Sequence, residues 1–313
     1  MELKCAIQMY NWGKHGMDSI VATLMKSANA DFVVDEQKTY AELWMGTHEN
    51  GPSYLKDTDV SLQKYIQENT KVLGETNIRR LLQATDSMIS DALRQCFYSL
   101  MTCDSNEVAQ QLKNLIDRLH NTDDSYRQWI KADLLKRLYA DYPGDVGCFT
   151  IYLFNYITMQ PGEAIYIGPN IPHAYLSGDC IECMACSDNV IRAGLTPKPK
   201  DVPTLIQILS FECELASARK IQPFREDVFT EVFRPPVPEF AVAKITLPPG
   251  RPSHNLKQRN SASILLIVSG KAEISSKIFS RGSVLFIPAN EVVEIKVLCG
   301  CHPMLMFQAF PNV

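Results

Sequence analysis

A block of helical periodicity enclosed by strand-like segments constrains the fold of this chain most strongly. Apolar residues recur at three- and four-residue spacing over 78–100, 108–119 and 129–138, which predicts amphipathic helices. The pattern stops at Tyr142-Pro-Gly-Asp145, a turn signal. Beyond this turn, runs of β-branched and aromatic residues alternate with proline and glycine turns. We therefore expect a mainly β fold with a helical insertion.

The expected strands are short and lie on both sides of the helical block. Pro235-Pro-Val-Pro238 reads as a linker before the last group of strands. A short helical piece is expected at 205–209, after a polar, proline-bearing stretch. The strand candidates are 40–46, 149–159, 164–167, 240–247, 263–268, 271–274, 284–287 and 292–297.

A weak internal repeat points to two similar sheet units. Gly162-Glu-Ala-Ile-Tyr-Ile-Gly-Pro-Asn170 aligns with Gly282-Ser-Val-Leu-Phe-Ile-Pro-Ala-Asn290, each with a glycine turn, a short strand and a Pro/Asn turn. A cupin-type β-barrel uses glycine, strand, proline turn and then histidine to present a metal ligand. His173 occupies that slot in the first copy and Val293 in the second. If the repeat holds, only the first barrel has the ligand and the second is structural.

Composition excludes several classes of protein. The 313 residues are 46% hydrophobic and 21% charged with a net charge of -4, which is a globular balance without the basic excess of a nucleic-acid-binding surface. Ten unevenly spaced cysteines fit reduced thiols in the cytosol. The start of the chain lacks the features of a signal peptide. The longest aliphatic run, Ile264–Val268, is too short to cross a membrane.

One segment holds most of the residues that could carry chemistry. Between Pro172 and Lys198, one imidazole, carboxylates, a phenol and two cations occur close together, a mixture that is costly to bury without a purpose. A busy, solvated loop between strands is the structural alternative. The residues concerned are His173, Tyr175, Glu182, Asp188, Arg192 and Lys198.

Each of these groups has a functional and a structural interpretation. A neutral imidazole at His173 could bind zinc, or it could be a packed, hydrogen-bonded histidine. Arg192 could bind phosphate through its planar fork and Lys198 as a mobile point charge, or each could pair with a neighbouring carboxylate. Cys180, Cys183 and Cys186 form a CxxCxxC pattern, but the apolar residues between them also suit buried strand thiols.

Eight segments carry a resemblance to a known family. They are Gln8–Lys14, Tyr40–His48, Tyr142–Phe149, Pro172–Lys198, Asp201–Leu205, Pro235–Pro238, Ser261–Leu266 and Arg281–Ile287. Together and in this order, over most of the chain, they resemble type I mannose-6-phosphate isomerase, the zinc-dependent phosphomannose isomerase of eukaryotes. The run from His173 to Lys198 is highly specific.

The resemblance implies a fold, a reaction and a set of site residues. The family has cupin-like jelly-roll barrels with a helical insertion and one zinc ion per chain. It interconverts mannose 6-phosphate and fructose 6-phosphate, which feeds GDP-mannose synthesis and glycosylation. By motif position His173 matches a zinc ligand and Arg192 matches the catalytic arginine, while the CxxCxxC stretch is not the family's zinc site. The residues that match the lining of the substrate pocket are Glu42, Tyr175, Glu182, Asp188 and Lys198.

The chain departs from the family at the metal. The family holds zinc with Gln, His, Glu and His, and the first three lie in a Gln-Ala-His-Pro-Asn-Lys and a His-Lys-Pro-Glu segment. This chain passes from Tyr65–Asn69 to Thr76–Arg80 without either segment, and His15 and His48 belong to other motifs. Since zinc sites normally use three or four protein ligands, we expect weak or absent zinc binding. We also expect the first barrel to have an incomplete sheet with exposed edges.

Two hypotheses follow. In the first, the chain is an aldose–ketose isomerase acting on a hexose 6-phosphate. In the second, it is a non-catalytic paralogue or truncated isoform, a cupin-like module that binds a sugar phosphate or a protein partner and keeps Arg192 and Lys198. Under both we expect a cytoplasmic monomer with a small-molecule hexose 6-phosphate as partner, and no nucleic-acid or membrane partner.

The expected domains follow the changes in pattern. Residues 1–75 form the N-terminal part of the first cupin-like barrel, and 76–141 form the helical domain. Residues 142–234 supply the remainder of that barrel with the active-site loop. Residues 235–313 form a C-terminal cupin-like β domain.

Overall fold

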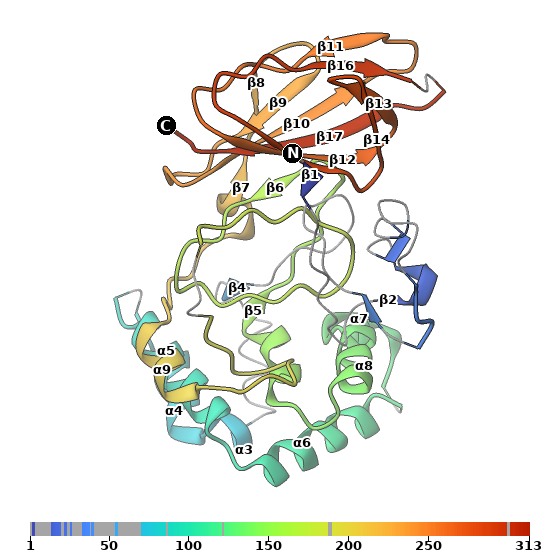
Figure 1. Ribbon diagram of the computed structural model, residues 1–313. Coiled ribbons are helices and arrows are strands. Elements are labelled where there is room, and N and C mark those ends of the chain that lie inside the picture. Colours follow the sequence, from blue (N-terminus) through green and yellow to red (C-terminus); the bar gives the residue numbers. More distant parts are fainter. Residues whose placement is uncertain are drawn as a thin grey trace.

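The structure is a computed structural model that places a β-sandwich over a largely irregular layer, with helices at the far end (Figure 1). The prediction of a mainly β chain with a helical insertion is confirmed. Within the described residues, no helix has the length and apolarity needed to cross a membrane. The described residues are 2–3, 14–19, 22–23, 26, 33–37, 39–40, 54–55, 70–85, 87–120, 122–186, 190–298 and 301–313.

Helices cover most of the three stretches with helical apolar spacing, and two further short helices form at 70–73 and 124–129. The helices are α3 (Thr70–Leu73), α4 (Glu75–Leu82), α5 (Ile89–Met101), α6 (Ser105–Arg118), α7 (Asp124–Trp129) and α8 (Ala132–Asp141). The carboxylate of Asp104 begins α6 by accepting the backbone N–H groups of Asn106 and Glu107. The apolar faces of α4, α5, α6 and α8 meet in one core, where Leu100, Leu112 and Leu135 are fully buried.

The stripe over 78–100 belongs to two helices and not to one. The chain turns between α4 and α5, where the N–H of Met88 donates to the carbonyl of Thr85 at 2.8 Å. Both helices nevertheless present their apolar residues to the same core, as Ile78 and Phe97 show. Because both helices bury their apolar residues in this core, the three- and four-residue spacing continues across the turn between them. The spacing alone therefore does not reveal the turn.

The run predicted as a strand over 149–159 is mostly not a strand. A 3-10 helix, η2 (Val146–Tyr152), comes first, and only β5 (Phe154–Asn155) is extended. The Asp145 carboxylate accepts the N–H of Gly147 at 2.7 Å and so begins this helix. Cys148, Phe149 and Ile151 are buried in the helical core, so tertiary packing overrides their strand preference.

The layer between the helices and the sandwich contains only short strands among the described residues. Three two-stranded sheets occur there: β2 (Lys14–His15) with β3 (Thr39–Tyr40), β4 (Tyr54–Leu55) with β5, and β6 (Ala164–Ile165) with β7 (Lys220–Ile221). Of the strand predicted at 40–46, residues 41–46 lie outside the described part. The short helices η1 (Gly16–Asp18) and η3 (Ala216–Arg219) also lie in this layer. The helix α9 (Val202–Ile208) lies beside α5 among the helices (Figure 1) and confirms the helical piece expected at 205–209.

The C-terminal sandwich pairs a seven-stranded sheet with a four-stranded sheet. Their orders are β1-β15-β12-β17-β10-β9-β8 and β11-β16-β13-β14. The strand at the chain's N-terminus is thus an edge strand of the C-terminal sandwich (Figure 1). The bounds are β1 (Glu2–Leu3), β8 (Phe224–Arg225), β9 (Thr230–Phe233), β10 (Ala241–Leu247), β11 (Ser253–Asn255), β12 (Ser263–Ser269), β13 (Lys271–Ile274), β14 (Lys277–Ser280), β15 (Val284–Ile287), β16 (Glu294–Val297) and β17 (Met304–Phe310).

Apolar side chains fill the space between the two sheets. Alternate residues of β10 are buried, as period-two alternation requires of a strand with one face in a core. Ile245, Leu265 and Ile295 from three different strands are at most 1% exposed. The sandwich is therefore a packed structural unit, whereas polar side chains gather in the irregular layer beneath it.

Candidate functional site

The internal repeat is visible in the backbone. Gly162 and Gly282 have φ angles of 89° and 88°, and Asn170 and Asn290 have 62° and 59°. These angles lie in the left-handed region that glycine, and to a lesser degree asparagine, tolerates. Two copies with the same residue types in the same unusual conformations confirm the repeat and give His173 and Val293 equivalent positions.

The two equivalent positions have different environments. Val293 is buried in the sandwich core, whereas the His173 side chain is exposed. Protein atoms nevertheless surround the imidazole closely enough that desolvation lowers its pKa.

The tautomer of His173 follows from one contact. Its Nδ1 lies 2.8 Å from the carbonyl oxygen of Ile171, and a carbonyl can only accept, so Nδ1 carries the proton. The lone pair of the neutral ring is then on Nε2, the arrangement that suits a metal ligand or a hydrogen-bond acceptor.

Three predicted site residues form one cluster. The Tyr175 hydroxyl donates to Oε1 of Glu182 at 2.7 Å. The His173 and Tyr175 rings meet edge to face with centroids 5.9 Å apart and an interplanar angle of 72°. The structure therefore brings an imidazole, a phenol and a carboxylate together, and we call His173, Tyr175 and Glu182 the imidazole cluster.

The two predicted cations lie on a single loop, residues 192–201. Its ends are joined by a 3.0 Å hydrogen bond from the N–H of Asp201 to the carbonyl of Arg192. The Asp201 side chain then accepts the N–H of Thr204 and begins α9. We call this segment the cation loop, because Arg192 and Lys198 lie on it.

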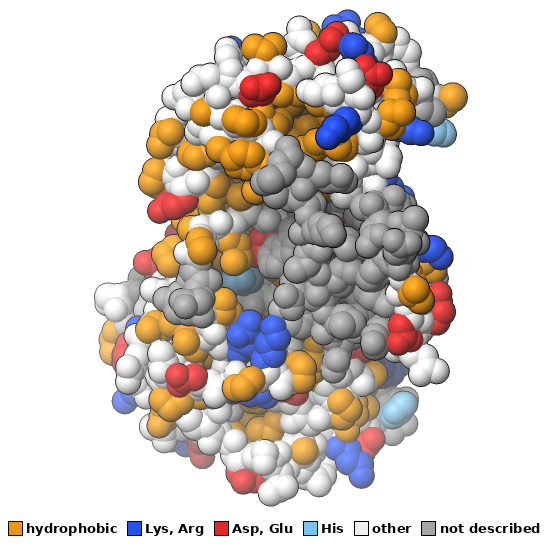
Figure 2. Space-filling model, in the orientation of Figure 1, with side chains coloured by type: hydrophobic (Ala, Val, Ile, Leu, Met, Phe, Trp, Pro, Cys, Tyr) orange, Lys and Arg blue, Asp and Glu red, His pale blue; other side chains and the backbone are white. Residues whose placement is uncertain are grey.

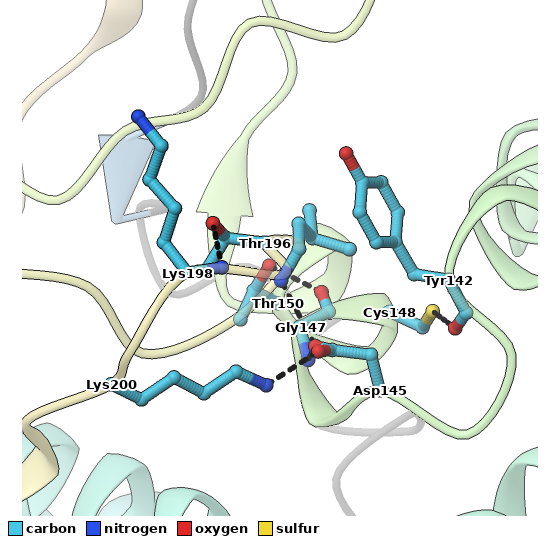
Figure 3. Close-up of polar contacts among 9 residues, drawn as sticks. Tyr142, Asp145, Gly147, Cys148, Thr150, Thr196, Lys198 and Lys200 are labelled. Atoms are coloured by element: carbon cyan, nitrogen blue, oxygen red, sulfur yellow. Dashed lines mark hydrogen bonds and ion pairs between the residues drawn. The ribbon is translucent and has the colours of Figure 1, made fainter. Parts of the chain in front are cut away.

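Asp145 joins the cation loop to the helical part of the molecule. Its Oδ1 accepts the N–H of Leu195 at 2.9 Å, and its Oδ2 lies 2.6 Å from Nζ of Lys200. Figure 3 shows the Lys200 side chain directed at Asp145, while the Lys198 side chain extends away from it. One carboxylate thus holds two points of the loop and leaves Lys198 pointing elsewhere.

Two glycines allow the loop to approach this closely. A Cβ at Gly194 would lie 2.8 Å from Cα of Gly147, and a Cβ at Gly147 would lie 2.7 Å from Cγ of Leu195. Neither glycine has a positive φ, so close approach is the reason for both. Leu195 itself adopts a φ of 50°, a strained conformation for a non-glycine residue.

Two of the predicted site residues cannot be placed. Glu42 and Asp188 lie outside the residues that the structure describes. The imidazole cluster and the cation loop each have their own contacts, and whether they face one shared cavity stays a prediction. Figure 2 shows lysine or arginine side chains and a histidine ring together in the middle of one face of the molecule.

The described thiols do not form a metal centre. Cys180 and Cys183 are partly buried and Cys186 is exposed. Burial, with a smaller contribution from Glu182, raises the pKa of the Cys183 thiol. Within the described ranges, no three His, Cys, Asp or Glu side chains are grouped so that they could hold a metal.

The described part of the chain also lacks a complete set of zinc ligands. His173 supplies one suitable nitrogen, but no second and third ligand accompany it in the described part of the chain. Zinc sites use three or four protein ligands, so the described residues do not by themselves fit the metal.

Asp145, Lys200 and Gly194 were not among the predicted site residues. The sequence signals for Asp145 were its place in a Pro-Gly-Asp turn after a helix and in one of the segments that resemble the family. The residues it holds are 50 and 55 positions further along the chain, so sequence spacing gives no indication of the contact.

Comparisons with known proteins decide the family. The catalytic-domain model of type I phosphomannose isomerase matches residues 1–85, the helical insertion model 65–154 and the C-terminal model 231–276. The human mannose-6-phosphate isomerase is 32% identical over 417 aligned positions, which span 98% of this chain and 97% of the human one. The chain belongs to the type I phosphomannose isomerase family. Mannose-6-phosphate isomerase 1 of Arabidopsis thaliana is 29% identical over 94% of this chain and 90% of its own length.

Solved structures of the family share the fold. A mutant of the phosphomannose isomerase from Salmonella typhimurium has a TM-score of 0.70 at 26% identity, covering 86% of this chain and 67% of that one. The apo form of the same enzyme has a TM-score of 0.68 at 25% identity over all of this chain and 77% of that one. These likenesses confirm the cupin-like architecture with a helical insertion.

The alignments also show how this chain differs from its relatives. The human alignment runs over 417 positions, whereas this chain has 313 residues. About a hundred positions of the relative therefore have no counterpart here.

Proposed function

We propose that this chain binds mannose 6-phosphate and fructose 6-phosphate and interconverts them, the reaction that gives its relatives their name. One observation carries the proposal: the imidazole cluster is assembled, and the two cations lie on a loop closed at its ends and anchored by Asp145. A sugar phosphate needs both kinds of group, since its hydroxyls take hydrogen bonds and its dianion takes cations.

The reaction moves one proton between neighbouring carbons. A base removes the proton from C2 of the aldose and returns it to C1, while the hydroxyl proton on O2 passes to O1, so that the C1 carbonyl becomes a hydroxyl and the C2 hydroxyl a carbonyl. The negative charge of the enediolate in between spreads over these two oxygens. A fixed cation beside those oxygens lowers the barrier because it meets charge that develops only in the transition state. We assign this role to Arg192, the proposed catalytic residue, and phosphate binding to Lys198.

The imidazole cluster would orient the sugar. In our assignment, the Tyr175–Glu182 pair presents a phenol and a carboxylate to the sugar hydroxyls in a geometry already fixed by their 2.7 Å hydrogen bond. Glu42 and Asp188 are proposed lining residues by motif position alone. Holding the reacting atoms in line removes part of the entropic cost of the reaction.

For the metal, we propose His173 as the zinc ligand that this chain retains. When bound, zinc would act as a Lewis acid toward the sugar oxygens. The described residues do not complete the site, and none of the steps above depends on the metal. We expect zinc binding to be weak or absent.

The missing ligand segments favour a second candidate function. A chain that keeps Arg192, Lys198 and the imidazole cluster but lacks the metal would bind a hexose 6-phosphate without turning it over. If the chain is an isomerase, we propose that it works as a cytoplasmic monomer and that its product supplies GDP-mannose synthesis and protein glycosylation. These assignments rest on the resemblance to the family.

One experiment separates the two functions. The purified chain is analysed for zinc per chain and assayed for interconversion of mannose 6-phosphate and fructose 6-phosphate, with and without added zinc. Turnover that is abolished in R192A identifies the enzyme. Binding of mannose 6-phosphate without turnover identifies the binding module. Neither binding nor turnover in a folded chain would contradict both. H173A tests the metal separately, because its zinc content should fall if His173 is a ligand.

A further inference from the structure

Asp145 lies outside the residues assigned to the sugar, yet it contacts the cation loop at two points. We propose that Asp145 is a positioning residue whose carboxylate sets the place of Lys198 in the phosphate subsite. This inference deepens the proposed function and rests on it. Asp145 does not touch the sugar in this account and acts only through the loop.

The contacts of Asp145 bracket Lys198 in sequence. Leu195, three residues before Lys198, donates its N–H to Oδ1 at 2.9 Å, and Lys200, two residues after it, places Nζ 2.6 Å from Oδ2. The same Oδ1 accepts the N–H of Gly147 at 2.7 Å. The carboxylate therefore ties the loop to the first turn of a buried helix.

Burial makes this anchor effective. The Asp145 side chain is 12% exposed, and hydrogen bonds to a shielded carboxylate are stronger than those in solvent. Cys148 and Phe149, which follow in the same 3-10 helix, are at most 1% exposed. The loop is thus held against a part of the core that cannot shift easily.

The backbone of Lys198 is also held by a contact within the cation loop. Its backbone N–H donates to Oγ1 of Thr196 at 3.2 Å, while its side chain extends away from Asp145 (Figure 3). A lysine side chain is flexible, so where its ammonium can reach is decided by where its backbone is held. Asp145 holds the loop before Lys198 through the backbone N–H of Leu195 and after it through the side chain of Lys200.

The test is a double-mutant cycle on the full chain, with mannose 6-phosphate as the titrated ligand. We expect D145A to weaken binding by roughly tenfold. If Asp145 acts through Lys198, the double variant D145A/K198A should bind no more weakly than K198A alone, within about twofold. A double variant whose loss is the product of the two single losses would overturn the proposal.

D104A is the matched control. Asp104 also accepts two backbone N–H groups at the start of a helix, so its removal costs stability of the same kind, but its partners lie within its own helix. We expect D104A to bind mannose 6-phosphate as the wild type does. K200M, a milder change that keeps the carboxylate, should weaken binding less than D145A. Binding by D104A as weak as that by D145A would contradict a positioning role.

Hydrogen exchange separates this proposal from the proposed function. Loss of the acceptor at Asp145 should speed amide exchange in peptides covering 193–200, and D104A should leave those peptides unchanged. If the wild type fails to bind the sugar but D145A still loosens the loop, the proposed function fails and the anchor stands. If exchange in 193–200 is the same in D145A and wild type, the anchor itself is wrong.

Discussion

Replacing Gly194 by alanine tests whether the cation loop sits as closely on the helical part as the structure shows. An added Cβ would lie 2.8 Å from Cα and 3.0 Å from the backbone nitrogen of Gly147, and 3.1 Å from Oδ1 of Asp145. All three separations are shorter than normal van der Waals contacts. Two of the neighbouring atoms are backbone that cannot rotate away, so the loop must move.

The size of the effect follows from two opposing contributions. Overpacking a well-packed region costs about 1–3 kcal/mol, and alanine recovers about 0.4–1 kcal/mol because the unfolded chain is less flexible. We therefore expect G194A to lower the free energy of unfolding by about 1–2 kcal/mol. Urea denaturation followed by circular dichroism measures this difference, and affinity for mannose 6-phosphate should fall in the same variant.

G168A is the control for this prediction. An added Cβ at Gly168 would meet its nearest atoms at 3.7 Å or more, which is ordinary contact, and its φ is not positive. We expect G168A to be as stable as the wild type or slightly more stable. Equal stability of G194A and G168A would show that the loop does not lie against Gly147 as described.

Three further predictions concern stability and reactivity. Glu226 and Arg259 form a partly buried bidentate pair at 2.7 Å, so E226Q should cost about 1–3 kcal/mol in urea unfolding, and no measurable cost would contradict the pairing. Burial raises the pKa of Cys148 to about 12, so iodoacetamide should label exposed Cys186 first, and equal rates by mass spectrometry would refute this. Burial lowers the pKa of His254 below its ordinary value of 6.5, so as the pH falls through this range the unfolded chain binds a proton before the folded chain does. The free energy of unfolding should therefore decrease as the pH is lowered, and H254Q should make this decrease smaller.

Local signals predicted much of the fold. The strands at 240–247, 263–268, 271–274, 284–287 and 292–297 are confirmed, and their ends differ from the prediction by at most two residues. The repeat was visible because glycine and asparagine mark backbone angles that other residues avoid. These features depend on residues close together in sequence, so a single sequence reveals them.

The errors have a common physical cause in long-range packing. Met304–Phe310 was not predicted as a strand, yet it lies between β12 and β10 in the seven-stranded sheet. Four of its first five residues are buried, so no period-two alternation marks it. The sequence predicted a strand over 149–159, but its first residues, Phe149–Tyr152, belong to a 3-10 helix. Aromatic and β-branched residues suit a buried helix as well as a strand, and packing in the core decides between the two.

The site was predicted in the same uneven way. Composition singled out His173, Tyr175 and Glu182 without indicating how they are arranged, and the structure brings their side chains together. The anchor at Asp145 depends on residues 50 or more positions apart, so it could be found only in three dimensions. The roles of the site residues remain predictions.

The central claim is that the imidazole cluster and the cation loop hold one sugar phosphate between them. A crystal structure of the chain with mannose 6-phosphate tests it most directly. We predict that the sugar hydroxyls lie within hydrogen-bond distance of Tyr175 or Glu182. Arg192 or Lys198 should lie beside the phosphate or beside O1 and O2 of the sugar, the oxygens that carry the charge of the enediolate. A ligand that contacts only one of these two groups, or binds elsewhere, would contradict it.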